Sequence, residues 1–419
     1  MTTAAPDPLR PASGAEAHVL ANRGVLGIGL GSLLSDTGHE MATAALPGFL
    51  RSLGAPAAAL GAIEGVADAA LSASKAAGGV LADQPGVERK AVTAGGYALT
   101  AAGHGAFGLA TVWPVVAVAR AVSWIARGGK APARDSLLSA SVPADQLGRA
   151  FGVERTMDSI GAIAGPLMAA PLIVTVGYRW LFAISIIPGL FAALAVLVLV
   201  REVPGVLHAA SDRPAGGAMR ALATTPGPFR RLLAGIGLFG LGNFSATLLI
   251  LRAAQLLHAH GRSNTKAAAV AVLLYAAHNA ANAVAAYPAG VVADRVGRQA
   301  VLIAGVLLFG AACVVFAFGS ASVAVLAALF VAVGVSTGLV ETGQGAHAAE
   351  LLDPTVRGRG FGLVGLVEGV GDLVSSVVVG VLFTVTDPAW GFAYAAALSI
   401  AGALVLIAER PGGTVAGRQ

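Results

Sequence analysis

The feature that most constrains the fold of this chain is a series of long apolar runs that follow one another along its whole length. Hydrophobic residues make up 56% of the sequence and charged residues only 12%, about half the ~25% usual in soluble domains. A helix crosses a bilayer with about 20 apolar residues, and lipid leaves the edges of an open sheet unsatisfied. The sequence therefore predicts an all-α polytopic membrane protein with twelve transmembrane helices. We place these spans near 24–50, 56–82, 91–110, 112–127, 148–176, 180–200, 230–257, 266–292, 299–319, 321–349, 359–384 and 389–408.

Two pairs of segments repeat at almost the same distance, so the chain contains two copies of one unit. Residues 78–90 (GGVLADQPGVERK) are echoed by residues 290–298 (GVVADRVGR), which places Asp83 and Asp294 211 positions apart. Residues 148–152 (GRAFG) are echoed by residues 358–362 (GRGFG), 210 positions later. We therefore expect two pseudo-symmetric six-helix halves, at 23–200 and 230–409. A polar linker at 201–229 joins them, and short segments at 1–22 and 410–419 flank them.

Basic residues are distributed unequally between the two sides of the membrane. With the N-terminus inside, the outer loops hold only Arg51, Arg179, Arg252, Arg262 and Lys266. The cytoplasmic segments hold most of the remaining cations, including Arg127, Lys130 and Arg134 in the segment after the fourth span. This positive-inside bias predicts that both termini are cytoplasmic. It also explains the net charge of +5 by topology, without a nucleic-acid partner.

These motifs, the twelve spans and the central linker resemble the major facilitator superfamily, in a branch of bacterial efflux transporters of the inner membrane. The resemblance implies a cytoplasmic gate at the two echoed turns, and it implies antiporter-like helix packing at Gly161, Gly165 and Pro166. The first turn departs from the pattern, because Gln84 and Pro85 replace the usual arginine and its neighbour, and Ala169-Ala170 stands where a glycine pair is usual. We assign the gate to Gly79, Asp83, Arg89, Gly290, Asp294, Arg295, Arg298 and Asp158.

Ionisable groups at the depth of a span are costly and mark candidate sites. Asp36 and Glu40 lie four residues apart in the first span, on one helical face. Arg120 lies near the middle of the fourth span and cannot lose its proton, so we expect it to pair with Asp36 or Glu64. The candidate substrate and proton-coupling residues are Asp36, His39, Glu40, Glu64, Asp68, Arg120, His278, Glu341 and Glu368.

The sequence favours a secondary transporter that works by alternating access, exchanging a small solute or drug for protons as an exporter. A divalent-cation exporter using Asp36, His39 and Glu40 is one alternative, and a membrane solute sensor is another. We expect no enzyme activity, because the chain has no phosphate-binding loop and no nucleophile with a placed histidine. We further expect no resident cofactor or metal, a proton as coupling ion, a small molecule or ion as substrate, and a monomer in the lipid bilayer.

Overall fold

The computed structural model describes residues 21–82, 84, 86–143, 146–202, 227–352 and 357–408. In these residues, the regular structure is entirely α-helical apart from one 3-10 turn. The prediction of an all-α polytopic fold is confirmed. The termini and most of the expected linker lie outside the described residues, so the predicted domain boundaries stay a prediction. The helices are α2 (Arg23–Ser52), α3 (Ala57–Ala82), α4 (Arg89–Ala106), α5 (Trp113–Ala140), α6 (Leu147–Thr175), α7 (Gly177–Leu199), α9 (Gly227–Gly240), α10 (Ala246–Ala259), α11 (Asn264–Val296), α12 (Arg298–Ala317), α13 (Val323–Leu351), α14 (Arg357–Val385) and α15 (Pro388–Ile407), with the turn η1 (Phe107–Leu109) after α4.

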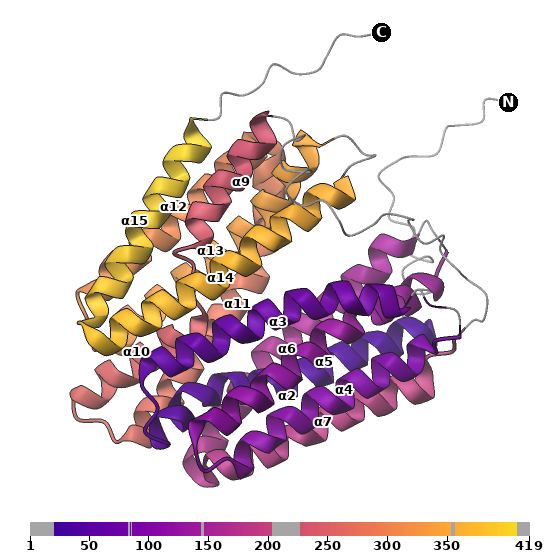
Figure 1. Ribbon diagram of the computed structural model, residues 1–419, viewed down its shortest axis with the longest axis horizontal. Coiled ribbons are helices and arrows are strands. Elements are labelled where there is room, and N and C mark those ends of the chain that lie inside the picture. Colours follow the sequence, from indigo (N-terminus) through magenta and orange to yellow (C-terminus); the bar gives the residue numbers. More distant parts are fainter. Residues whose placement is uncertain are drawn as a thin grey trace, which may run out of the picture.

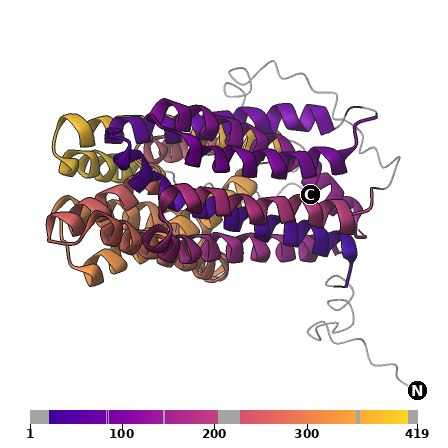
Figure 2. The same ribbon diagram turned by 90° about the horizontal axis from the view of Figure 1, so that it is seen from below.

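The helices form two bundles that lie side by side (Figure 1). The first bundle contains α2–α7 and the second contains α9–α15, and most helix pairs pack within their own bundle. Three pairs make the main contacts between bundles, namely α3 with α14, α6 with α11, and α2 with α10. Figure 2 shows the helices running along a common direction. We call the end that holds Arg23 and Ile407 the termini end, and the end that holds Ser52 and Asn264 the far end.

Glycines let helices of the two bundles approach closely. A Cβ on Gly61 of α3 would clash with the backbone oxygen of Ser376 on α14, and a Cβ on Gly380 of α14 would lie 2.8 Å from the backbone oxygen of Ala57. In a membrane, where no hydrophobic effect drives helices together, such close approach gains dispersion contacts. The α3–α14 seam is therefore set by small residues near the far end.

Seven of the described helices are long and apolar enough to cross a membrane on length and composition: α6, α7 and α11–α15. Helices α2–α5 do not meet these criteria, and they contain buried polar and charged side chains such as Asp36, Glu64 and Arg120. The less apolar helices therefore belong to the first bundle, where the candidate charges gather.

Two expected spans differ from the structure. The run expected as one span at 230–257 is interrupted at 241–245, between α9 and α10. The span expected at 112–127 is longer, because α5 continues to Ala140. Arg127, Lys130 and Arg134 therefore lie inside a helix of the bundle and not in a connecting segment, as the sequence had suggested. Lys130 is only 4% exposed, and the two arginines have carboxylate partners, which offset the cost of burying their charge.

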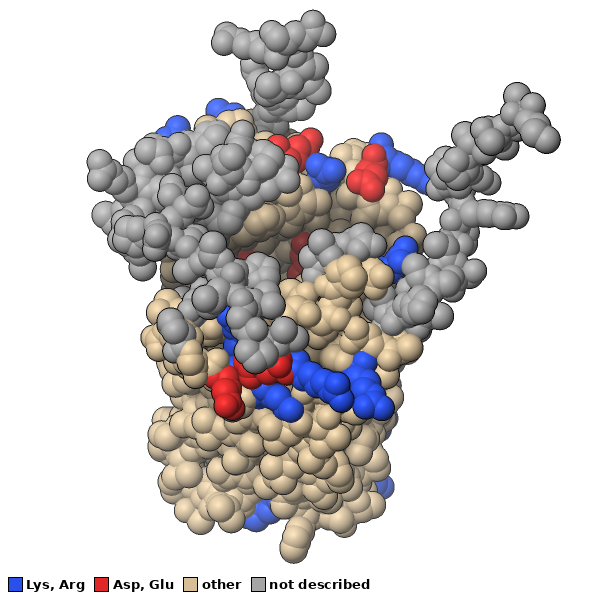
Figure 3. Space-filling view, turned by 90° about the vertical axis from the view of Figure 1, so that its right-hand side faces the viewer, with Lys and Arg blue, Asp and Glu red and all other residues tan. Residues whose placement is uncertain are grey.

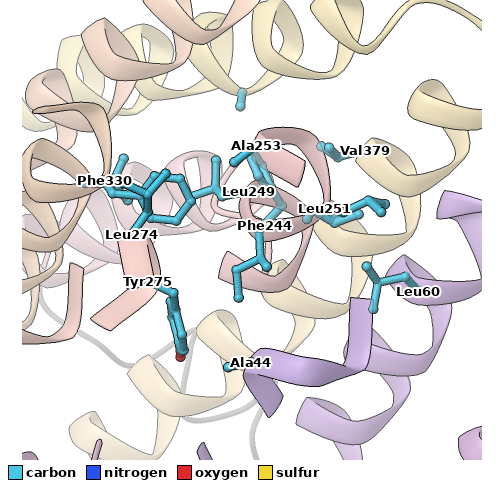
Figure 4. Close-up of a cluster of buried hydrophobic side chains, with 14 of the residues drawn as sticks. Ala44, Leu60, Phe244, Leu249, Leu251, Ala253, Leu274, Tyr275, Phe330 and Val379 are labelled. Carbon is cyan, nitrogen blue, oxygen red and sulfur yellow. The ribbon is translucent and has the colours of Figure 1, made fainter. Parts of the chain in front are cut away.

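The hydrophobic core is shared between the bundles only toward the far end. There, Leu60 of α3 and Ala44 of α2 join a cluster with Phe244, Leu251 and Val379 of the second bundle (Figure 4). At the termini end the clusters are separate. One is centred on Val25, Ile28 and Tyr97 and lies wholly in the first bundle; the other contains Ala289, Ala293 and Val301 of the second.

Candidate functional site

The bundles are separated at the termini end. A Cβ on Gly79 would meet nothing within 4 Å, and a Cβ on Gly290 would meet only Thr342 of its own bundle. Figure 3, viewed from the side of the termini, shows a hollow in the surface with acidic atoms inside it. Together with the core that spans both bundles at the far end, these features describe a cavity that opens at the termini end.

Asp36 forms the shortest ion pair of the first bundle. Arg127 donates from Nη1 to Oδ1 at 2.6 Å and from Nη2 to Oδ2 at 3.2 Å, a bidentate geometry that fixes both side chains. Asp36 is 5% exposed. Asp158 of α6 interacts with the same carboxylate. Asp158 therefore lies beside this ion pair in the first bundle, and its assignment to the gate stays a prediction.

Arg120 is fully buried and pairs with Glu64, the second of its two expected partners. Its Nη2 donates to Glu64 Oε2 at 2.9 Å, and its Nη1 donates to Thr43 Oγ1 at 3.0 Å. The guanidinium group lies 3.5 Å from the centre of the Trp124 ring, a favourable cation–π position. Trp124 Nε1 in turn donates to Asp68 Oδ1 at 3.0 Å. Three groups thus contact one buried cation directly, and Asp68 holds the Trp124 ring in place.

Three arginines of α5 occur at seven-residue intervals, so they lie on one face of the helix two turns apart. Arg120 and Arg127 pair with α3 and α2, and Arg134 pairs with Glu154 of α6 at 2.8 Å. Ser32 of α2 also donates to Glu154 at 2.8 Å. Each of these three arginines therefore has a carboxylate partner from a different helix.

Glu40 lies one turn from Asp36 but has no cation within ion-pairing distance. Its Oε1 is 3.7 Å from His39 Nε2, and its Oε2 has no hydrogen-bond partner in the described part of the chain. Tyr275, on α11 of the second bundle, interacts with it. Figure 4 shows the hydroxyl group of Tyr275 pointing away from Leu274 and Phe330. Glu40 is therefore a buried carboxyl group at the boundary between the bundles.

His39 points into the first bundle. Its ring lies 4.6 Å from Trp124 and 5.1 Å from His104, measured between ring centres. Asp36 is meanwhile occupied by Arg127. The residues proposed as an alternative metal site therefore do not converge, and no group of three His, Cys, Asp or Glu side chains suited to a metal occurs in the described ranges.

Carboxyl groups without a cation partner lie between the bundles. Asp68 of α3 interacts electrostatically with Asp372 of α14. Asp372 also interacts electrostatically with Glu368, one turn away on the same helix. Gln344 of α13 donates to Glu368 at 2.6 Å, and Glu341 of α13 interacts with Glu368. Within the residues that the structure describes, none of these four carboxyl groups forms an ion pair within 4.0 Å. Together they form an acidic band, defined as Asp68, Glu341, Glu368 and Asp372.

The remaining predicted residues are placed as follows. Gly161 and Gly165 pack against α2, where added Cβ atoms would meet the Leu33 oxygen and, at 2.6 Å, the Cβ of Glu40; Pro166 is buried beside them. His278 is 7% exposed and stacks on Tyr275 at 5.7 Å, so it lies in the core of the second bundle.

The predicted gate is not assembled in this structure. The Asp294 side chain is 75% exposed and lies 4.0 Å from Arg298 of its own bundle, which is also 3.8 Å from Glu350. Arg295 is exposed. In the first bundle, Arg89 donates from Nε to the Ala82 oxygen at 3.0 Å, and Asp83 lies outside the described residues.

Sequence reasoning missed Arg127, Lys130, Trp124 and Tyr275 as members of the site. The spacing of Arg127, Lys130 and Arg134, at positions i, i+3 and i+7, was an available signal. That spacing places all three on one side of a helix, whereas a connecting segment would have no reason to keep it. No comparable signal in the sequence identifies Trp124 or Tyr275.

Comparison with known proteins agrees with this architecture. The family model of the Major Facilitator Superfamily matches residues 28–277 and 263–418. The chain belongs to this superfamily, and it is a secondary transporter. It is 26% identical over 382 residues to an uncharacterized MFS-type transporter of Methanocaldococcus jannaschii, covering 91% of this chain and 93% of the relative. It is 28% identical over 374 residues to an uncharacterized protein of Mycobacterium tuberculosis, covering 85% and 86%.

Solved structures share the fold at low identity. The nucleoside transporter NupG has a TM-score of 0.74 at 16% identity, covering 92% of this chain and 98% of that one. A bacterial homolog of the human lysosomal transporter Spinster, in an inward-facing and occupied conformation, has a TM-score of 0.69 at 16% identity, covering 92% and 94%. At such identities the likeness concerns the fold alone.

Proposed function

We propose that this transporter exports a small cationic solute in exchange for protons. The observation that carries the proposal is the unequal pairing of charges around the cavity. The buried arginines of the first bundle each have a carboxylate partner. The acidic band and Glu40, by contrast, have no cation at ion-pair distance among the described residues.

Proton coupling follows from the cost of leaving a carboxylate unpaired. A carboxyl group that is largely buried without a counter-ion is more stable in its neutral form, so Glu40, Asp68 and Asp372 are groups that can bind a proton. Asp36 is held by Arg127 in this conformation, and a rearrangement that separates the pair would make Asp36 another proton acceptor. Loss and gain of protons would then accompany the change of conformation.

The same carboxyl groups determine the charge of the substrate. A cation that enters the cavity can replace the protons on Asp68 and Asp372, whereas an anion would be repelled by the deprotonated band. Because proton and cation compete for the same oxygens, binding of one releases the other. This competition is sufficient for antiport in a protein that alternates between two openings.

The direction of transport follows from the orientation predicted by the basic residues. If the termini end is cytoplasmic, the cavity of this conformation takes solute from the cytoplasm, and an inward proton gradient drives export. Helix packing supports antiport, because Gly161 and Gly165 bring α6 against α2 at Asp36 and Glu40.

A thermal-shift panel on the purified protein tests the substrate class. The panel contains organic monocations, polyamines, divalent metals, and anionic and neutral solutes. We expect stabilisation by organic cations or polyamines, and we expect the double variant Glu368→Gln, Asp372→Asn to lose it. Stabilisation by anions, or an unchanged cation response in the double variant, would rule out the proposed role of the acidic band. Stabilisation by divalent metals alone would favour the metal-exporter alternative.

A further inference from the structure

Specific hydrogen bonds stabilise the interruption of the seventh expected span, at residues 241–245. Between α9 and α10, Ser245 donates its backbone N–H to Ser376 Oγ at 3.1 Å, and Ser375 donates its hydroxyl to the Asn243 oxygen at 2.8 Å. Both serines of α14 are fully buried. Polar backbone groups inside a membrane need such partners, so α14 stabilises the break in a defined geometry. This geometry places the first residue of the second helical piece at the boundary between bundles.

Ser245 joins the start of α10 to the buried ion pair of the first bundle. Its Oγ donates to Glu64 Oε2 at 3.3 Å, and the same oxygen accepts from Arg120 at 2.9 Å. Glu64 is 3% exposed and Arg120 is fully buried. A helix N-terminus favours a negative charge nearby, so ionised Glu64 stabilises the position of α10 as well as that of Arg120. One carboxylate oxygen therefore receives donors from both bundles.

Helix α10 closes the far end. Beyond Ser245 it packs against α2 and α3, and two cavities of about 280 Å³ each share Pro47 and Arg51 of α2 and Leu251 of α10 in their linings. Leu251 belongs to the apolar cluster that spans both bundles (Figure 4). A displacement of α10 away from the first bundle would open this end of the molecule.

A second carboxyl group lies near Arg120 and could pair with it when Glu64 is replaced by glutamine. Asp68 lies one turn along α3 from Glu64 and accepts a hydrogen bond from Trp124, the ring on which Arg120 stacks. The charged and titratable groups that face Glu64 are thus Arg120 on α5, Asp68 on its own helix, and Tyr275 on α11. Arg120 therefore has a nearby carboxylate to move to, which would avoid leaving an unpaired buried cation.

We infer that the hydrogen bond between Ser245 and ionised Glu64 is a latch that keeps the far end closed. The inference rests on the proposed alternating access. When this hydrogen bond breaks, the N-terminus of α10 is no longer held beside the negative charge of Glu64. The helix then separates from α2, and the far end opens. Glu64 and Ser245 act as positioning residues, because neither needs to touch the substrate.

Distance measurements between spin labels test the latch without knowledge of the substrate. The single native cysteine, Cys313, is fully buried in α12 and is replaced by alanine. One label pair, Ser52→Cys with Asn264→Cys, spans the far end, and a second pair, Ala91→Cys with Ala300→Cys, spans the termini end. In this background, we expect mainly short distances across the far end and long distances across the termini end.

Two variants and one control distinguish the latch from general packing. We expect Glu64→Gln, which keeps the shape and removes the charge, to raise the ratio of far-end-open to far-end-closed molecules about tenfold, as for the loss of a hydrogen bond to a charged group. Ser245→Ala should shift this ratio in the same direction while leaving the Arg120 pair intact. Thr384→Ala removes another hydrogen bond between the bundles, the 2.8 Å bond from the Ala58 N–H, and should leave the ratio nearly unchanged.

The outcomes separate the latch from the proposed function. Distances in Glu64→Gln and Ser245→Ala that match the unaltered protein would overturn the latch, as would an equal shift of the distances in Thr384→Ala. If Glu64→Gln does not fold, Ser245→Ala alone decides. A transporter whose solute flux ignores a pH gradient would refute proton coupling, whereas the spin-label distances would still show whether Glu64 controls the far end.

Discussion

At the scale of single residues, pairing decides which charges are held in place in this conformation and which have no partner in it. Arg127 illustrates the first case, because both of its terminal nitrogens bind Asp36. Glu40 illustrates the second, because one of its oxygens has no partner in the described part of the chain. Burial alone does not separate these roles, since both carboxyl groups are largely enclosed. The partner of each charge is the informative observation.

We expect Arg127→Met to destabilise the protein, because it leaves Asp36 without its counter-ion. Breaking a buried ion pair by removing one partner typically costs about 3–5 kcal/mol; the Arg127 side chain is 24% exposed, so we expect the lower part of that range. Thermal unfolding in detergent measures the loss. Arg295→Met, at an exposed arginine of the second bundle, is the control and should leave the melting temperature nearly unchanged. Equal melting temperatures for both variants would contradict the structural role of the pair.

At the scale of helices, the positions of spans could be predicted from the sequence, and their internal breaks and charges could not. Hydropathy located the apolar runs because lipid demands them. It placed the end of α5 too early, since Arg127, Lys130 and Arg134 look like a solvated segment until their carboxylate partners are known. The break before Ser245 escaped prediction because the serines that satisfy it, Ser375 and Ser376, are more than a hundred residues away in the chain.

The candidate site divides in the same way. The mid-span carboxyl groups could be predicted as site residues, since an ionisable group at that depth is costly and marks a candidate site. Their partners could not: Arg120 had two possible carboxylates at comparable depth, and only the rotation of α3 relative to α5 selects Glu64. The proximity of Tyr275 to Glu40 depends on how the two bundles meet, which hydropathy does not encode.

Close packing of α6 on α2 gives a prediction at the helix scale. A Cβ at Gly165 would lie 2.6 Å from the Glu40 Cβ and 2.7 Å from the Thr37 oxygen, so Gly165→Ala should destabilise by about 1–3 kcal/mol through overpacking. Gly152→Ala, in the same helix, is the matched control, because its Cβ would meet nothing within 4 Å. Melting temperatures of the two variants measure the difference. A Gly165→Ala variant as stable as Gly152→Ala would show that α2 moves aside without cost.

At the scale of the whole molecule, the two bundles share a core at one end and are separate at the other. This arrangement is one of the two conformations that alternating access requires. In the other conformation, the bundles would close at the termini end and bring the predicted gate residues together. Asp294 is exposed in the present conformation, so its contribution would arise only after closure. The orientation of this cycle relative to the cell rests on the distribution of basic residues.

Cysteine labelling checks that orientation. Because the native Cys313 is fully buried, exposed cysteines introduced at Arg262 on the far end and Gln84 on the termini end can be labelled selectively. We expect a membrane-impermeant maleimide to label Arg262→Cys in intact cells, and to label Gln84→Cys only after permeabilisation. The reverse pattern would invert the proposed direction of transport.

The central claim is that protonation of buried carboxyl groups drives transport, and gradient-driven flux tests it most directly. Everted vesicles with an acidic interior are supplied with the organic cation that gives the largest thermal shift. We predict that the wild-type protein accumulates this cation until the pH gradient is collapsed. Asp36→Asn should lose gradient-driven uptake while still exchanging labelled for unlabelled cation. Uptake by the wild-type protein that persists without a pH gradient, or wild-type gradient-driven uptake in Asp36→Asn, would contradict the account.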